Sequence, residues 1–253
     1  EEISSYPQVV CALGTFDGVH LGHQLLIRQA VEMAKAEKNT VSMVITFACH
    51  PWQVLFPERE VVLLSERKSK NEYLASLGVD VLLELPGTKE LFSMEGEIFL
   101  EKLFGARNVS HVFVGKNYSF GKGGLGNVTL LQEKAIIYGT QVHIESLKAN
   151  GEGIHISSTH IREALKRGDL EQANASLGRP FGFYDIVRHG DERGRLLGFP
   201  TANFWFPPHV VKPKDGVYVN RVRIGDTWYQ GIGNIGDNPT FVDQRHRLEV
   251  HLL

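Results

Sequence analysis

The sequence predicts two domains, a doubly wound parallel α/β domain followed by a small antiparallel β-barrel. Up to about residue 178, apolar runs of strand length alternate with segments whose apolar residues recur at helical spacing. Beyond that point helical periodicity stops, and short alternating runs separated by glycine and proline take over. The length of 253 residues also favours two domains over one. We therefore expect one domain over residues 1–178 and a second over residues 179–253.

The N-terminal elements predict a β-loop-α-β unit. Residues 9–13 (VVCAL) form a short apolar run that ends at Gly14, which is typical of a buried strand. Apolar residues at mostly helical spacing follow over residues 21–38, and residues 41–47 (VSMVITF) return to a strand pattern. Because a helix connects the two strands, we expect them to be parallel.

The same alternation continues to the end of the first domain. We expect helices near residues 65–77, 95–103 and 129–138, and strands at residues 79–85, 111–114 and 141–146. Two more helices, near residues 158–167 and 170–177, lead to Arg179-Pro180, which breaks the helical pattern. In the second domain the strand-like runs are residues 217–224, 228–232 and 247–253.

Charge and cysteine content exclude several classes of protein. The formal net charge of −2 gives no reason to expect nucleic acid or an anionic membrane as a partner. The two cysteines, Cys11 and Cys49, form no disulfide framework, and Cys11 lies in an apolar run where an inert buried thiol is expected. No stretch reaches the roughly 20 apolar residues of a membrane span, and the N-terminus lacks a signal-peptide pattern. We expect a cytoplasmic protein, whose oligomeric state the sequence does not indicate.

The loop after the first strand, residues 14–23 (GTFDGVHLGH), is the strongest candidate site. In an open α/β sheet, ligands bind in loops that leave the C-terminal ends of strands. The N-terminus of the following helix offers free N–H groups and a partial positive charge, which suit phosphate. Gly18 and Gly22 allow close backbone approach. His20 and His23 share one face of the first turn, where each can donate to phosphate oxygens.

Two other interpretations of these histidines remain open from the residues alone. They could be capping and solvated side chains without a ligand. A zinc site from His20, His23, His50 and Cys49 is also conceivable, although it lacks a Cys-x-x-Cys or His-Glu-x-x-His core.

The motif GTFDGVHLGH is similar to the His-x-Gly-His region of nucleotidylyltransferases. Its Phe-Asp-Gly-Val-His form resembles the prokaryotic bifunctional riboflavin kinase/FAD synthetase family. The resemblance implies a Rossmann-like domain that transfers the adenylyl group of ATP to FMN, giving FAD and pyrophosphate. It implies that His20 and His23 are catalytic and stabilise charge at the α-phosphate without a covalent intermediate. The residues of this loop then expected to bind ATP and its phosphates are Gly14, Phe16, Asp17 and Gly22.

A second segment, residues 156–162 (ISSTHIR), resembles the Ser-Ser-Thr-x-Ile-Arg motif of the same family, with His160 where Arg is usual. Thr159 is expected to cap the helix that starts here, and Arg162 lies one turn later. A hydroxyl, a helix N-terminus and a guanidinium suit a pyrophosphate leaving group. We therefore expect Ser158 and Thr159 to bind phosphate and Arg162 to be catalytic. An ordinary cap with a surface arginine is the alternative.

Two weaker segments fit the same resemblance. Residues 47–51 (FACHP) resemble the family's Phe-x-Pro-His-Pro, with cysteine in place of the first proline. Residues 115–121 (GKNYSFG) are similar to the loop that lies by the nucleotide and the flavin. The candidates for this flavin and nucleotide region are His50, Asn117 and Asn127, the last of which stands where aspartate is common.

Residues 121–126 (GKGGLG) offer an alternative, because they match the G-x-G-x-x-G pattern of dinucleotide-binding proteins. A helix follows, and Glu145 ends the next expected strand. However, the preceding strand is expected to end near Val114, which leaves a longer connection than the tight turn of that motif. The unit also lies late in the sheet, so NAD binding is disfavoured.

The second domain carries a further motif, Gly198-Phe199-Pro200-Thr201-Ala202-Asn203, which resembles the GFPTAN loop of riboflavin kinases. Glycine admits close backbone approach, and Thr201 and Asn203 supply neutral oxygens that suit a Mg²⁺-bound ATP. Residues 190–197 lead into this motif, and residues 231–241 continue the likeness. A simple Gly/Pro turn is the alternative.

Glu249 is the candidate base of this second site. Arg247, Glu249 and His251 alternate with apolar residues, so period two places Glu249 on the polar face of a strand. By resemblance it takes the proton of the riboflavin 5′-hydroxyl. An exposed strand carboxylate is the alternative. Because family members continue beyond this strand, we expect the kinase half of a chain that stops at Leu253 to be incomplete and weak.

The resemblance thus implies a bifunctional enzyme with ATP, FMN and riboflavin as substrates, FAD as product and Mg²⁺ as cofactor. Two other functions remain open. The first domain could transfer nucleotides to another small phosphorylated substrate, as its superfamily does. Alternatively, the chain could be a flavin-binding regulator with an inactive kinase half.

Overall fold

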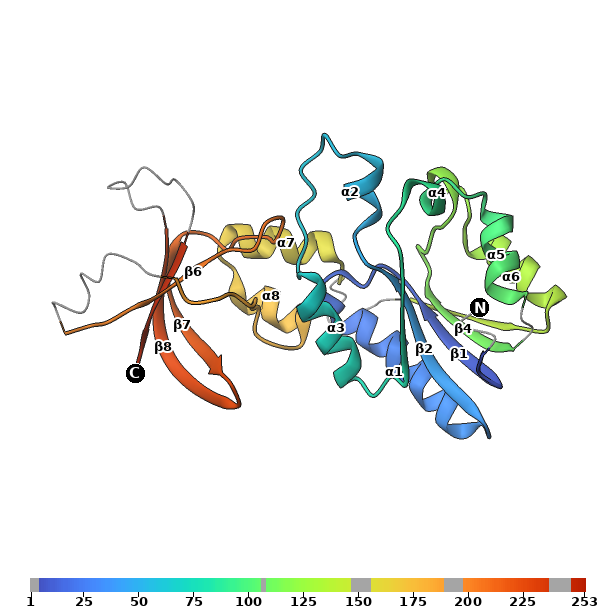
Figure 1. Ribbon diagram of the computed structural model, residues 1–253, viewed down its shortest axis with the longest axis horizontal. Coiled ribbons are helices and arrows are strands. Elements are labelled where there is room, and N and C mark those ends of the chain that lie inside the picture. Colours follow the sequence, from blue (N-terminus) through green and yellow to red (C-terminus); the bar gives the residue numbers. More distant parts are fainter. Residues whose placement is uncertain (1–4, 106–107, 147–155, 189–197, 237–246) are drawn as a thin grey trace.

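The computed structural model describes residues 5–105, 108–146, 156–188, 198–236 and 247–253. Figure 1 shows two units along the long axis, each built on its own sheet. Within these described ranges, the first sheet has five strands and the second has four. The helices α7 (Ser158–Arg167) and α8 (Leu170–Leu177) lie between the two sheets. The predicted change from α/β to β structure is confirmed.

The first sheet is parallel throughout, with the strand order β3-β2-β1-β4-β5. Its strands are β1 (Gln8–Leu13), β2 (Thr40–Phe47), β3 (Val81–Leu85), β4 (Val109–Gly115) and β5 (Gln141–Glu145). The chain builds outward from β1 to β3 and then crosses back to β4. The direction of winding therefore reverses between β1 and β4, which is where ligands of open α/β sheets bind. The predicted doubly wound sheet is confirmed.

Helices cover both faces of this sheet because the strand residues alternate in direction. On β1, Val10 and Ala12 belong to the core beneath α1, whereas Val9, Cys11 and Leu13 belong to the opposite core. The helices over the two faces are α1 (Leu21–Ala36) and α3 (Arg67–Ser76) on one, and α5 (Gly96–Phe104) and α6 (Val128–Ile137) on the other. Burial raises the pKa of the Cys11 thiol to about 12, in line with the predicted inert thiol.

Three short elements of the structure were not predicted from the sequence. They are the helices α2 (Pro51–Leu55) and α4 (Lys89–Phe92) and the strand β6 (Ala202–Trp205). Helices of five and four residues are too short to show an apolar period. Local capping defines α2, since the side chains of His50 and Gln53 each accept a backbone N–H of the first turn. Two 3-10 turns, η2 (Asp17–Val19) and η3 (Lys122–Gly124), complete the first unit.

The second unit is an antiparallel sheet with the order β6-β9-β8-β7. Its remaining strands are β7 (Gly216–Ile224), β8 (Thr227–Gly236) and β9 (Arg247–Leu252). Part of the predicted GFPTAN loop is strand, because Ala202 and Asn203 open β6. Residues 190–197 and 237–241, which carry other parts of the riboflavin kinase likeness, lie outside the described residues.

The second unit also packs back onto the first through residues 207–215, which we call the return segment. Leu63 and Val210 form a parallel bridge, in which the Leu63 N–H donates to the His209 carbonyl at 2.6 Å. The Val211 N–H donates to the Leu63 carbonyl at 2.7 Å, and Val211 is buried in a core with Ile161 and Leu165. Residues from before and after residue 178 therefore pack in one core, which joins the two units.

Candidate active sites

The loop that joins β1 to α1 has a strained backbone. Phe16, Gly18 and Val19 all have positive φ angles, of 51°, 75° and 39°. This conformation is rare for a β-branched residue such as Val19, and such strain gathers at functional sites. A Cβ at Gly18 would lie 2.6 Å from Leu64 Cδ1, so glycine is required there for space as well as for φ. Arg179 secures the loop by donating to the Gly18 carbonyl at 2.8 Å.

His20 and His23 lie together at the start of α1. His20 is the N-cap, and its Nδ1 accepts the His23 N–H at 3.3 Å. The two rings stack with centroids 3.6 Å apart. Burial, together with the neighbouring His20, holds the pKa of His23 well below its usual range, so His23 is neutral at pH 7. Its Nδ1 is buried and has no hydrogen-bond partner among the described residues.

Asp17 connects this loop to the second predicted motif. Its Oδ2 accepts from Arg162 Nη1 at 2.7 Å, across 145 positions of sequence, and its Oδ1 accepts the Leu64 N–H at 2.8 Å. Burial raises the pKa of Asp17, while the Leu64 N–H and Arg162 oppose that rise. The Ser158 hydroxyl donates to the Asp17 carbonyl at 3.0 Å. The structure thus brings the start of α7 against the loop of residues 14–23.

The cap of α7 differs from the prediction. Ser157, not Thr159, is the N-cap, and its hydroxyl accepts the His160 N–H at 3.2 Å. Thr159 lies in the first turn, where its hydroxyl accepts from Arg162 Nη2 at 3.4 Å. Three consecutive hydroxyl residues can each serve as a cap, and packing selects the first of them.

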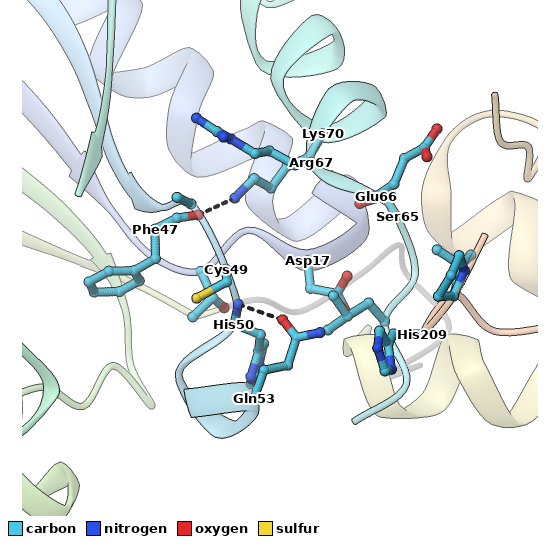
Figure 2. A pocket seen from close by; sticks show the side chains of 15 residues that line it. Asp17, Phe47, Cys49, His50, Gln53, Ser65, Glu66, Arg67, Lys70 and His209 are labelled. Carbon is cyan, nitrogen blue, oxygen red and sulfur yellow. Dashed lines mark hydrogen bonds between the residues drawn. The ribbon is translucent and has the colours of Figure 1, made fainter. Parts of the chain in front are cut away.

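A cavity of about 200 Å³ opens beside this loop (Figure 2). The residues that line it come from the ends of β1 and β2, from residues 63–70 and from the return segment. They are Thr15, Asp17, Phe47, Ala48, Cys49, His50, Gln53, Leu63, Ser65, Glu66, Arg67, Lys70, Pro208, His209 and Val210. Both polar and apolar side chains are therefore available to a ligand.

Lys70 is a residue of this cavity that the sequence analysis missed. It is 8% exposed, and its Nζ donates to the Phe47 carbonyl at 2.7 Å and to the Thr46 hydroxyl at 3.4 Å. Burial lowers its pKa. A lysine four residues before the buried Leu74, and so on the inner face of α3, was the signal that could have found it.

His50 lies at the same cavity, as the N-cap of α2. Its Nδ1 accepts the Trp52 N–H at 3.2 Å, and burial, with smaller contributions from Arg162 and Lys70, lowers its pKa to about 4. A neutral His50 thus lines the cavity together with Asp17. The zinc alternative gains no support, because the described part of the chain has no group of three or more His, Cys, Asp or Glu placed to hold a metal ion.

Asn117 and Asn127 follow β4, beyond the point between β1 and β4 where the winding of the sheet reverses. Asn117 is exposed in the turn that follows β4. Asn127 is the N-cap of α6, and its Oδ1 accepts the N–H groups of Thr129 and Leu130 at 3.0 and 3.1 Å. Capping alone accounts for that side chain. The glycine-rich loop before it closes on itself through Phe120 and Gly126, well after the end of β4. This does not form the tight strand-to-helix turn of a dinucleotide motif.

The remaining loop residues have structural surroundings of their own. Phe16 is 1% exposed, and its ring packs edge-on against His23. A Cβ at Gly14 would lie 3.0 Å from the Phe16 ring, and Gly22 is buried in the first turn of α1. These residues shape the loop around the histidines.

Glu249 and Asn203 face each other across the second sheet. Asn203 on β6 pairs with Glu249 on β9, which in turn pairs with Asn234 on β8. Paired residues on neighbouring strands point to the same side of a sheet, so the three side chains form one row. The Glu249 carboxylate accepts from Arg247 Nε at 2.9 Å. The structure therefore brings together two residues that the sequence assigned to this site.

His251 anchors the turn that carries Thr201. Its Nδ1 donates to the Pro200 carbonyl at 2.8 Å, and its ring lies edge-on to Phe199. Thr201 itself is exposed and lies directly before β6, two residues from Asn203. The sequence analysis did not assign a role to His251.

Two family models match the chain. The model described as FAD synthetase matches residues 2–160, and the model described as riboflavin kinase matches residues 177–253. Within the described residues, no helix has the length and apolar character needed to cross a membrane.

Several curated relatives are named bifunctional riboflavin kinase/FMN adenylyltransferase. The protein of Listeria monocytogenes is 39% identical over 96% of this chain and 77% of its own length. The Bacillus subtilis protein is 36% identical over 96% of this chain and 77% of its own length. The Escherichia coli K12 protein is 36% identical over 99% of this chain and 80% of its own length.

A solved structure has the same fold. It is described as a macrolide-efflux protein from Streptococcus pneumoniae, with a TM-score of 0.85 and 30% sequence identity. The likeness covers 98% of this chain and 80% of that one. The family models and the curated relatives agree with the resemblance that the sequence motifs indicated. The chain therefore belongs to the bifunctional riboflavin kinase/FMN adenylyltransferase family.

Proposed function

We propose that the loop of residues 14–23 and the start of α7 form the adenylyl-transfer site, and that β6 and β9 carry the phosphoryl-transfer site. The chain is an enzyme of FAD biosynthesis that combines FAD synthetase and riboflavin kinase domains. One observation carries the first assignment. The ion pair of Arg162 with Asp17 joins two motifs that are far apart in sequence, at the loop that holds His20 and His23.

In the adenylyl-transfer step, a phosphate oxygen of FMN attacks the α-phosphorus of ATP, and the bond to the pyrophosphate breaks. The protein needs to hold the two anions in line and to stabilise the added charge. The imidazoles of His20 and His23 supply N–H donors at the N-terminus of α1, which itself favours phosphate. Their stacked, buried rings lose little freedom when the substrates bind.

The start of α7 suits the leaving pyrophosphate. Ser158 and Thr159 place hydroxyl groups in its first turn, and Arg162 adds a guanidinium one turn later. Asp17 holds Arg162 by one of its nitrogens, so the position of the guanidinium is fixed before the substrates arrive. We assign Asp17 this positioning role, and Gly14, Phe16 and Gly22 the shaping of the loop.

In the phosphoryl-transfer step, the riboflavin 5′-hydroxyl attacks the γ-phosphorus of ATP, and the bond to the β-phosphate oxygen breaks, which gives FMN and ADP. We assign Glu249 as the base that accepts the hydroxyl proton. Its carboxylate is paired with Arg247, and it belongs to the cross-strand row that includes Asn203 and Asn234. In this second site the groups are held by the pairing register of β6, β9 and β8, whereas those of the first site are held by a folded loop.

The donor set beside Glu249 fits Mg²⁺. Thr201 and Asn203 offer neutral oxygens next to a carboxylate, and hard oxygen ligands are what Mg²⁺ prefers. We propose that these two residues hold the metal together with the ATP phosphates. When bound, Mg²⁺ would neutralise charge that develops on the phosphates.

We further propose a functional boundary near residue 178, with the catalytic residues of adenylyl transfer in residues 1–178 and those of phosphoryl transfer in residues 179–253, in a cytoplasmic enzyme. The adenylyl-transfer motifs all precede Arg179. The net charge of −2 and the cysteine pattern support the compartment.

The substitution Arg162→Lys tests the first site. A lysine keeps the charge but loses the fork that can hold Asp17 and a phosphate together, so FAD formation should fall about ten-fold or more. Arg167→Lys on the exposed face of the same helix is the matched control and should retain full activity. Chromatographic separation of FAD from FMN provides the measurement. Equal FAD formation by the two variants would remove Arg162 from the site.

A further inference from the structure

The cavity at the candidate adenylyl-transfer site has a wall from the second unit. Most of its lining belongs to the first unit, but Pro208, His209 and Val210 come from the return segment. Figure 2 shows His209 on the side of the cavity opposite Lys70. His209 is a side chain of this wall that can donate a hydrogen bond.

The backbone around His209 is fixed from both directions. Its carbonyl accepts the Leu63 N–H at 2.6 Å, and two residues later Val211 donates to the Leu63 carbonyl at 2.7 Å. Val211 is 1% exposed in the core between the units. His209 also has a φ of 65°, a left-handed conformation that costs a side-chain-bearing residue free energy. The backbone therefore holds His209 in place on the cavity wall.

Among the described residues, one cation that lines the cavity forms no ion pair with a carboxylate, although Glu84 and Asp17 oppose the lowering of its pKa. Asp17 is paired with Arg162, and Arg67 is paired with Glu84 at 2.6 Å. The carboxylate of Glu66 accepts the Tyr184 N–H at 3.0 Å and the Ser69 hydroxyl at 3.1 Å.

Lys70 is the exception. Its ammonium is buried and donates only to a carbonyl and a hydroxyl among the described residues. A buried cation of this kind favours an anion in the cavity. Imidazole and ammonium are donors that suit a phosphate.

We propose that His209 contacts a phosphate group of a substrate of adenylyl transfer, together with Lys70, so that the second unit completes the binding site of the first. The proposal rests on the adenylyl-transfer site assigned above. Both FMN and ATP carry the required phosphate, and separate titrations of the two distinguish them. The contact is made by the ring, and the return segment supplies its position.

Two substitutions separate the ring from the backbone. His209→Gly removes every side-chain donor while glycine adopts the left-handed conformation freely. His209→Asn tolerates the same conformation and keeps an N–H donor. Lys212→Ala, on the return segment outside the cavity lining, is the matched control.

The experiment measures the KM values for FMN and for ATP in FAD formation by the full chain. We expect His209→Gly to raise the KM of one substrate about ten-fold, which is the loss of a hydrogen bond to a charged group. The kcat should change much less, and His209→Asn should lie between His209→Gly and the unaltered protein. Lys212→Ala should match the unaltered protein. A rise for FMN identifies the flavin phosphate as the ligand, and a rise for ATP identifies the triphosphate.

Unchanged KM values for both substrates in His209→Gly would overturn the proposal. Circular dichroism spectra and urea titrations of the same preparations report whether the variants are folded. His20→Ala, assayed in parallel, distinguishes a failure of the role of His209 from a failure of the adenylyl-transfer assignment. If His20→Ala abolishes FAD formation while His209→Gly has normal KM values, only the role of His209 fails. If His20→Ala is fully active, the adenylyl-transfer site itself is wrongly placed.

Discussion

The candidate adenylyl-transfer site joins residues that are far apart in the chain, whereas the candidate phosphoryl-transfer site lies across neighbouring strands. Asp17 and Arg162 are 145 positions apart and meet only because α7 packs against the first loop. Asn203, Glu249 and Asn234 meet because β6, β9 and β8 pair in register. The first site therefore depends on tertiary packing, and the second depends on strand pairing.

The two sites also differ in how they manage charge. Asp17 and His20 are 6% and 2% exposed, and burial keeps His23 neutral. The Glu249 side chain is 33% exposed and is paired with a neighbouring arginine on its own strand. A buried, preformed site suits a step that relies on positioning. A half-open strand site suits a base that must meet a hydroxyl and a metal-bound nucleotide.

The substitution with the largest expected effect inactivates one site and leaves the other active. Glu249→Gln removes the base but keeps the shape of the side chain, so riboflavin phosphorylation should fall by about 10²- to 10⁴-fold. FAD formation from supplied FMN should remain, because no described contact links Glu249 to the first site. Glu133→Gln on α6 serves as the control for a neutralised carboxylate. If Glu249→Gln retains kinase activity, the row of Asn203, Glu249 and Asn234 does not catalyse phosphoryl transfer.

The second prediction compares the backbones of the two units. Gly18→Ala must adopt a left-handed φ and place a Cβ 2.6 Å from Leu64. We expect it to lower the free energy of unfolding by about 3 kcal/mol. Gly225→Ala, in the β7–β8 turn, has a φ of 59° but nothing within 4 Å of its Cβ, and should lose only about 1 kcal/mol. Urea titrations of both variants give the measurement. Equal losses in the free energy of unfolding would show that Leu64 can move to make room for the Cβ and that the loop is not tightly packed.

The smallest expected effect concerns pH. The pKa of His50 is lowered to about 4 in the folded protein, whereas the unfolded chain binds the proton near pH 6.5. The unfolded state therefore takes up more protons below pH 6.5, and stability is lost as the pH falls from 6.5 toward 4. His50→Asn keeps the helix cap but does not titrate. From pH 7 to 5 the unaltered protein should lose about 2 kcal/mol more than the variant. Parallel curves would contradict the burial of His50.

The sequence predicted most of the fold, because apolar periodicity reports which face of an element is buried. The strands and long helices lie within a few residues of their predicted bounds, and the order of the parallel sheet agrees with the β-α-β pattern. The short helices α2 and α4 escaped because they are defined by caps rather than by a period.

The sites were predictable to the extent that single motifs carry them. His20 and His23 followed from a glycine-bearing loop before a helix, and Glu249 followed from alternation along one strand. The place of Lys70 on the inner face of α3 was signalled by Leu74, four residues later. What did not follow are the contact of Lys70 with the end of β2, the pairing of Asp17 with Arg162 and the position of His209. Each depends on contacts between segments that are distant in sequence, and no local pattern reports such contacts. The misplaced cap at Thr159 has the same origin, since packing chose Ser157.

The central claim is that the two activities reside in two separate constellations, one of them at His20 and His23. The most direct measurement is the formation of both FMN and FAD by His20→Ala, from riboflavin and ATP, resolved by chromatography. The account predicts that FAD formation falls by about 10²-fold or more, the loss expected for a transition-state donor, while FMN accumulates at the unaltered rate. Near-normal FAD formation, or an equal loss of both products, would contradict it.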